Sequence, residues 1–299
     1  MHKQFHGTGI ALVTPFKDNL QIDFESLTKV IEHSIANGAD YLVALGTTGE
    51  APTLSGKEKR AVLEHVKLVN KHRLPMMLGL GGNDTADIIS KIEDFDFKSV
   101  DGVLSVCPYY NKPTQAGIYE HYTALASKCP VPIIIYNIPG RTGVNIASHT
   151  TIKLSENKNI IGIKECTSDF NQLVDVKRGT HPDFLLISGD DILTLPIMSI
   201  GGVGVISALA NALPHVFSNI TSHALNNDFA SVATDVQKIN EVIKLIFEEG
   251  NPVGVKCLLE VMGLTKRNVR LPLVNASESL KDKIQKELQK SALIPQIVY

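Results

Sequence analysis

The sequence predicts an α/β fold, namely a (β/α)8 TIM barrel in residues 1–227 and a C-terminal helical extension in residues 228–299. Short apolar runs recur along the chain, a helical pattern follows each run, and the last part of the chain shows helical patterns alone. Near-continuous apolar strands are typical of parallel sheets that are covered on both faces. A barrel of eight such units needs roughly 250 residues, which the chain of 299 residues supplies.

We expect one barrel strand in each apolar run and one helix after it. The first helix illustrates the pattern, since Asp23 can cap its start and Gly38 can end it. Its apolar face consists of Phe24, Leu27, Val30, Ile31 and Ile35. The eight runs are residues 9–15, 41–46, 75–80, 102–106, 132–137, 160–164, 184–189 and 202–207.

An open, doubly wound sheet shares this alternation of strands and helices and is the structural alternative to a barrel. Sheets of that kind carry G-x-G-x-x-G or G-x-x-x-x-G-K-[ST] where they bind a nucleotide. Neither motif occurs where a nucleotide would require it, and "GLGGND" departs from the first motif at its last position. The closed barrel is therefore favoured.

Residues 192–214 carry no charge and are long enough to cross a bilayer. Pro196, Asn211 and Pro214 interrupt the stretch, as do the glycines between residues 201 and 204. We therefore expect a buried helix, a tight loop and a short strand. The helical pattern from residue 228 onward is too short for an independent enzyme domain and is interpreted as a packing or oligomerisation element.

The composition excludes several partners. With 29 basic and 31 acidic residues, the chain has no surplus charge to hold nucleic acid or an anionic membrane. Ten histidines show no metal-ligand spacing, so we predict no metal. The N-terminus lacks the apolar core of a signal peptide, and the four cysteines form no C-x-x-C pair, which predicts a reducing cytoplasm. A small-molecule substrate is the expected partner.

Three chemically active side chains fall near the ends of predicted strands. Lys164 ends the sixth strand, Tyr136 lies at the end of the fifth, and Arg141 follows in a loop rich in glycine and proline. Because the carboxyl ends of barrel strands meet at one mouth, these side chains share a common location. Each has a simpler structural interpretation: a solvated cap for the lysine, a core residue for the tyrosine and a surface residue for the arginine.

The segment "GTTGE", residues 46–50, follows the second strand. Gly46 and Gly49 permit a tight turn, and its N–H groups together with the hydroxyls of Thr47 and Thr48 could hold a carboxylate. An ordinary turn is the alternative. Glu50 is assigned to structure, as a carboxylate stabilised at the start of a helix.

Amine catalysis unites these groups. A lysine in an apolar barrel mouth loses hydration as an ammonium ion, so its pKa falls and its neutral amine can attack a ketone to form a Schiff base. The iminium acidifies the neighbouring methyl group, and the resulting enamine attacks an aldehyde. A 2-oxo acid such as pyruvate fits the carboxylate site of the Gly-Thr-Thr-Gly turn.

Six segments occur in the order and spacing of one family: "GTTGEAPTL", "PYYNKP", "YNIPGRTG", "GIKECT", "SGDD" and "GVISALAN". On these motifs the chain resembles the dihydrodipicolinate synthases, which belong to the pyruvate-dependent class I aldolases, from about residue 7 to about residue 290. The resemblance implies a lyase that condenses pyruvate with L-aspartate 4-semialdehyde in diaminopimelate and lysine biosynthesis, through a Schiff base and without a cofactor.

The resemblance also implies a role for each site residue. Lys164 would form the Schiff base, Tyr136 would act as general acid and base, and Thr47 and Tyr110 would complete its proton relay. Thr48 would join Thr47 in binding the pyruvate carboxylate. Tyr110 reaches a neighbouring subunit in this family, which implies a dimer at least and typically a homotetramer. Arg141 would bind the carboxylate of the aldehyde, and the carbonyl group of Ile206 would face the lysine.

Other functions remain open at this point. An N-acetylneuraminate or 2-keto-3-deoxy sugar acid aldolase would share the lysine and the tyrosine, although Arg141 and the second threonine of "GTTGE" favour the synthase. A catalytically silent barrel could act as a binding protein, but it would have lost part of the relay. A pyridoxal-phosphate enzyme could use Lys164, yet we find no convincing phosphate site.

One difference from the family concerns regulation. Members that lysine inhibits often carry histidines shortly after "GTTGE", where this chain has Gly56 and Lys59. Asn83, Asp87 and Tyr109 match other parts of that regulatory site. Because an added ammonium group repels a cationic effector, we expect weak or absent inhibition by lysine.

Overall fold

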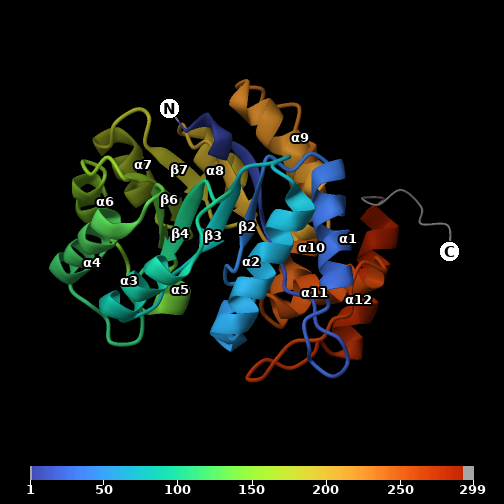
Figure 1. Ribbon diagram of the computed structural model, residues 1–299. Helices are drawn as coiled ribbons and strands as arrows, with labels where there is room; N and C mark the ends of the chain where they lie inside the picture. The colour runs from blue at the N-terminus through green and yellow to red at the C-terminus, as the bar shows by residue number, and fades with distance from the viewer. Residues whose placement is uncertain (1, 292–299) are drawn as a thin grey trace.

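The computed structural model describes residues 2–291 and contains a closed barrel of eight parallel strands that follow one another in chain order (Figure 1). The predicted (β/α)8 TIM barrel is therefore confirmed, and the open sheet is excluded because β1 pairs with β8. The strands are β1 (Gly7–Ala11), β2 (Tyr41–Ala44), β3 (Met76–Gly79), β4 (Gly102–Val106), β5 (Ile133–Asn137), β6 (Ile160–Glu165), β7 (Leu185–Ser188) and β8 (Gly204–Ser207).

The predicted runs differ from the observed strands mainly at β1, which begins two residues before its run, at Gly7. Gly7 pairs with Gly204 of β8, so the sheet extends beyond the apolar run. The run also overshoots at its far end, since the N–H group of Val13 donates to the side chain of Asn211 at 3.0 Å and leaves the ladder. Side-chain hydrogen bonds of this kind cannot be read from apolar patterning.

A helix follows each strand and covers the outside of the barrel. In α1, Asp23 accepts a hydrogen bond from the N–H group of Ser26, and the helix ends at Ala36, two residues before Gly38 with its φ of 86°. Both predicted signals are thus used. The barrel helices are α1 (Phe24–Ala36), α2 (Gly56–Asn70), α3 (Thr85–Asp94), α4 (Gln115–Lys128), α6 (Ser148–Leu154), α7 (Phe170–Gly179), α8 (Thr194–Ser199) and α9 (Pro214–Leu225), and shorter helical turns are η1 (Lys3–Phe5), η2 (Ala51–Thr53), α5 (Pro139–Thr142) and η3 (Leu209–Asn211).

The barrel interior is filled at its N-terminal end. The rings of Phe5 and Tyr41 pack edge to face with centroids 5.6 Å apart, and both side chains are fully buried. Gly9 allows this packing, because a Cβ atom there would lie 2.3 Å from the Tyr41 ring. The closed end leaves the opposite mouth, at the carboxyl ends of the strands, as the place for a site.

The charge-free stretch at residues 192–214 folds as predicted, with helix α8, a loop at Gly201 and Gly202, and strand β8. Within residues 2–291, no helix is both long enough and apolar enough to cross a membrane.

Three helices follow α9: α10 (Ala233–Glu248), α11 (Val253–Val261) and α12 (Glu278–Ser291). Figure 1 shows them, in orange to red, on the same side of the barrel as α1. The division of the chain after residue 227 stays a prediction. Residue 1 of the predicted barrel and residues 292–299 of the predicted extension lie outside the described residues.

Candidate active site

A cavity of about 900 Å³ opens at the carboxyl ends of the strands. Residues from β1 to β6 and from β8 line it, together with loops at the carboxyl ends of the strands and part of the C-terminal extension. Six of the seven predicted site residues line this cavity, namely Thr47, Thr48, Tyr136, Arg141, Lys164 and Ile206.

Lys164 and Tyr136 are neighbours across the sheet. They are register partners in β6 and β5, and the Lys164 Nζ atom lies 4.3 Å from the centroid of the Tyr136 ring. The side chains are almost fully enclosed, with 6% of Lys164 and 5% of Tyr136 exposed. The charged residue at the end of this buried strand is therefore a lysine whose side chain is almost fully enclosed beside a phenol.

The pKa of Lys164 is lowered from its ordinary value, chiefly because burial removes water from the ammonium group. The positive charge of Arg141 acts in the same direction, whereas Cys166 and Asp191 oppose it. Gly189 provides the space for this conformation, since a Cβ atom there would lie 2.9 Å from Cε of Lys164. Lowering the pKa populates the neutral amine, which is the nucleophilic form.

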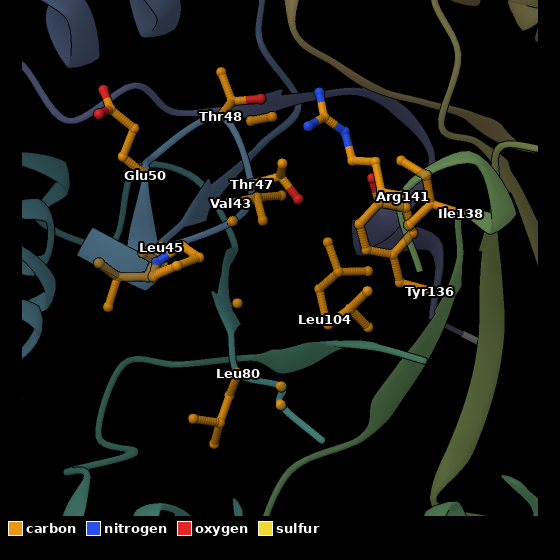
Figure 2. A pocket seen from close by; sticks show the side chains of 18 of the residues that line it. Val43, Leu45, Thr47, Thr48, Glu50, Leu80, Leu104, Tyr136, Ile138 and Arg141 are labelled. Carbon is orange, nitrogen blue, oxygen red and sulfur yellow. The ribbon is translucent and has the colours of Figure 1, made fainter. Parts of the chain in front are cut away.

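The hydroxyl of Tyr136 is also out of contact with bulk water. Burial raises its pKa well above the usual value, and a hydrogen bond with the side chain of Thr47 partly offsets this effect. The Cys166 thiol approaches the same hydroxyl, with Sγ and Oη 3.9 Å apart. Figure 2 shows Thr47 and Tyr136 on the cavity wall, with Arg141 above the tyrosine. A phenol that stays protonated can donate and then recover a proton.

The "GTTGE" segment forms the expected turn. The N–H group of Gly49 donates to the carbonyl of Gly46 at 3.1 Å, and that of Glu50 donates to the carbonyl of Thr47 at 3.0 Å. Within residues 2–291, the N–H groups of Thr47 and Thr48 donate to no backbone carbonyl. These two amides are thus available for a carboxylate, whereas the N–H groups of Gly49 and Glu50 are not.

Glu50 is structural, but the physical reason differs from the predicted one. Its side chain caps no helix; it is 3% exposed and forms a buried ion pair with Lys256 of α11. The carboxylate also accepts a hydrogen bond from the N–H group of Arg270 at 3.0 Å. A contact between residues so far apart in the chain leaves no local sequence signal.

Arg141 lies in the short helix α5 and reaches the rim of the cavity. One of its guanidinium nitrogens donates to the backbone carbonyl of Asn251 at 3.0 Å. Ile206, in β8, also lines the cavity and is 1% exposed.

Tyr110 is the one predicted site residue that the chain does not bring to the cavity. Its side chain is 87% exposed, and its backbone is in the left-handed region with φ of 73°. Tyr109, next to it, lines the cavity instead. Of the three residues of the predicted proton relay, one chain brings Tyr136 and Thr47 to the cavity but not Tyr110.

Two further cavity residues had no assigned role in the sequence. Asp191 is 4% exposed, and burial raises the pKa of its carboxyl group to about 6. The positive charge of Lys164 acts in the opposite direction and lowers this pKa. Asn251 comes from the extension and contacts both Thr48 and Arg141. The motif "SGDD" pointed to Asp191 without a function, and nothing in the local sequence pointed to Asn251.

Comparison with known proteins agrees with this arrangement. Residues 4–291 match the model of the dihydrodipicolinate synthetase family. The chain is 50% identical over 281 residues to the 4-hydroxy-tetrahydrodipicolinate synthase of Cytophaga hutchinsonii, a match that covers 94% of this chain and 95% of that protein.

Solved structures give the same result. The dihydrodipicolinate synthase of Thermotoga maritima superposes with a TM-score of 0.94 at 34% identity and covers 97% of this chain and 100% of its own. The chloride-inhibited dihydrodipicolinate synthase of Acinetobacter baumannii, solved with pyruvate bound, has a TM-score of 0.93 at 36% identity and covers 97% and 99%. On the agreement of motifs, fold and cavity, the chain belongs to the dihydrodipicolinate synthetase family.

Proposed function

We propose that the protein is a 4-hydroxy-tetrahydrodipicolinate synthase, a lyase of the class I aldolase type that condenses pyruvate with L-aspartate 4-semialdehyde. The observation that carries the proposal is Lys164, enclosed beside Tyr136 with a lowered pKa at the base of the cavity. The relatives named above favour this reaction over the cleavage of sugar acids and over a silent barrel.

In the proposed reaction, the neutral amine of Lys164 attacks the C2 carbonyl of pyruvate, and water leaves to form an iminium ion. The iminium draws electrons from the methyl group, which loses a proton and becomes an enamine. The enamine carbon then attacks the aldehyde carbon, and the aldehyde oxygen takes up a proton. Tyr136 supplies and recovers these protons, with Thr47 as its hydrogen-bond partner. The amino group of the aldehyde substrate finally attacks the imine carbon and displaces the amine of Lys164, which closes the ring of the product and frees the lysine.

Two binding points orient the substrates. Thr47 and Thr48 hold the pyruvate carboxylate through their hydroxyls and free backbone N–H groups. Arg141 binds the carboxylate of the aldehyde, since a guanidinium group pairs with a carboxylate through two parallel hydrogen bonds. The carbonyl of Ile206, in β8, faces the lysine in β6. The reaction needs neither a metal nor a bound cofactor, because the iminium itself accepts the electrons.

Tyr110 is proposed to act in a neighbouring subunit. The exposure of this phenol, beside the cavity-lining Tyr109, supports a role across an interface. We therefore propose a homodimer as the smallest active unit and a homotetramer of two dimers as the full assembly.

Inhibition by lysine is proposed to be weak or absent. Gly56, Lys59, Asn83 and Asp87 line the same cavity as the proposed catalytic residues. Lys91 also lines it and lowers the pKa of Lys59, after the larger effect of burial. Lys91 is paired with Asp87, so repulsion of a cationic effector would come chiefly from the ammonium group of Lys59. Strong inhibition at submillimolar lysine would refute this proposal.

We propose a cytoplasmic location, where both substrates would be available and thiols stay reduced. Four free cysteines agree with such a compartment.

A coupled assay tests the function. Pyruvate, aspartate 4-semialdehyde and a dihydrodipicolinate reductase are combined with the purified protein, and oxidation of the reduced nicotinamide cofactor is followed. The proposal expects turnover in this assay and none with N-acetylneuraminate. Cleavage of N-acetylneuraminate without turnover of the aldehyde would assign the protein to the other branch of the superfamily.

A further inference from the structure

The C-terminal extension supplies a residue to the cavity. Asn251 lies between α10 and α11 and contacts two residues that were assigned to substrate carboxylates. Its Nδ2 atom donates to the Thr48 hydroxyl oxygen at 3.1 Å, and its backbone carbonyl accepts from Arg141 at 3.0 Å. One residue of the extension thus touches both proposed binding points.

The direction of the hydrogen bond to Thr48 has a chemical consequence. A threonine hydroxyl has one proton to donate and two lone pairs that can accept. Because Asn251 is the donor, the Thr48 oxygen uses a lone pair for this contact and keeps its proton. Thr48 is 3% exposed, so water competes little for that proton. The hydroxyl is left ready to donate to a carboxylate in the cavity.

Within the part of the chain that the structure describes, the Asn251 side chain makes no second hydrogen bond. The Oδ1 atom of Asn251 is buried and has no partner within residues 2–291. An amide kept only for packing and stability would be expected to satisfy both of its polar atoms. The one hydrogen bond that the amide makes is directed at a residue of the carboxylate site.

The extension also holds the rest of the "GTTGE" turn. Glu50, two residues after Thr48, has a φ of 52° and is fixed by Lys256 and by the N–H group of Arg270. Lys256 donates in addition to the carbonyl of Asn268 at 2.8 Å. The turn is therefore anchored on one side of Thr48, and the amide of Asn251 orients the hydroxyl itself.

We infer that Asn251 is a positioning residue of the pyruvate site, which acts by reserving the Thr48 proton for the substrate carboxylate. The inference rests on the proposed function, since it takes pyruvate as the ligand. It assigns to the C-terminal extension a part in substrate binding within the same chain.

Two substitutions at position 251 separate this role from packing. Asn251→Ala removes the donor, whereas Asn251→Asp keeps the size but offers an acceptor that takes the Thr48 proton. We expect the half-saturating pyruvate concentration to rise about fivefold to tenfold for alanine and about tenfold further for aspartate. This concentration is measured by trapping the Schiff base with borohydride over a range of pyruvate concentrations and quantifying the labelled protein by intact-protein mass spectrometry. If aspartate binds pyruvate as well as asparagine, or if alanine has no effect, the inference is wrong.

Weaker pyruvate binding by Asn251→Asp has another explanation, namely repulsion between the introduced aspartate and the substrate carboxylate. The same substitutions at position 251 in a Thr48→Val variant test that explanation. In Thr48→Val, no hydroxyl proton remains to be captured, so the alanine and aspartate variants should differ by less than about threefold. If aspartate remains about tenfold weaker than alanine in that background, charge repulsion explains the result and the inference is overturned.

Controls identify the other causes of failure. The amide of Asn226 donates to the carbonyl of Ser222 on the exposed surface, so Asn226→Ala and Asn226→Asp should leave pyruvate binding unchanged. Thermal unfolding followed by circular dichroism, and full labelling at saturating pyruvate, show that each variant is folded. If the unsubstituted protein is not labelled at all, the proposed function fails, whereas equal pyruvate binding in labelled variants overturns the inference about Asn251 alone.

Discussion

Two buried lysines of this chain have opposite surroundings. Lys256 is fully buried against Glu50, so its charge is paired and its role is structural. Lys164 is nearly as enclosed, yet it forms no salt bridge within residues 2–291. A buried ammonium group without a carboxylate partner favours its neutral form. At Lys164, burial outweighs the opposing charge of Asp191 and lowers the pKa, which populates the neutral amine.

The lowered pKa of Lys164 predicts how imine formation depends on pH. The neutral amine is the reactive form, so the rate of imine formation with pyruvate should rise as pH passes through the lysine pKa. We expect the midpoint of this rise to lie below 10.5, the ordinary value for lysine. Borohydride quenching at timed intervals measures it.

A substitution of Arg141 tests the cause of the lowered pKa. Burial lowers the pKa of Lys164 most, and the positive charge of Arg141 lowers it further. Arg141→Ala should move the midpoint upward. A midpoint at or above 10.5 in the unsubstituted protein would contradict the argument from burial.

Substitution of Arg141 should affect the KM values of the two substrates differently. Because it is assigned to the carboxylate of the aldehyde, Arg141→Ala should raise the KM for aspartate 4-semialdehyde about tenfold to a hundredfold. The KM for pyruvate should change much less. Steady-state kinetics with each substrate varied in turn measures both values, and equal losses for the two would reassign the residue.

At the scale of elements, the ion pair between Glu50 and Lys256 joins the β2 loop to α11. Lys256→Met leaves the Glu50 carboxylate buried without its cation, which should lower the free energy of unfolding by about 3–5 kcal/mol. Urea unfolding at neutral pH measures this loss.

A matched double variant tests the cause. Glu50→Gln combined with Lys256→Met removes both charges, so most of the lost stability should return. Should the double variant be no more stable than Lys256→Met alone, the pair would not be the reason for the loss.

The elements also show what could be predicted from sequence. Apolar runs marked every strand, and the cap at Asp23 marked the start of α1, because both are local patterns. The proximity of Lys164 and Tyr136 could be predicted because a barrel brings its strand ends together. Contacts between segments far apart in the chain could not be predicted, because they leave no local pattern. One example is the hydrogen bond from Val13 to Asn211 beyond the end of β1, and another is the hydrogen bond from Asn251 to Thr48.

At the scale of the whole molecule, Tyr110 makes the proposed relay depend on assembly. It projects away from its own chain and is 87% exposed. If it serves the neighbouring subunit, two inactive variants should complement each other. Lys164→Ala keeps a normal Tyr110, and Tyr110→Phe keeps a normal Lys164, so a mixed dimer contains one complete site.

Equal mixing of these two variants should restore about a quarter of the normal activity, since half of the random dimers are mixed and each has one complete site. The variants are unfolded together, refolded and assayed, with each variant refolded alone as the control. Activity no higher than that of the controls would place Tyr110 outside the relay of a partner.

The central claim is that Lys164 forms a Schiff base with pyruvate, and borohydride reduction followed by peptide mass spectrometry tests it most directly. The account predicts that pyruvate and borohydride together inactivate the protein and leave a reduced pyruvyl adduct on Lys164, with no adduct in Lys164→Ala. Retained activity, or an adduct on any lysine other than Lys164, would contradict the account.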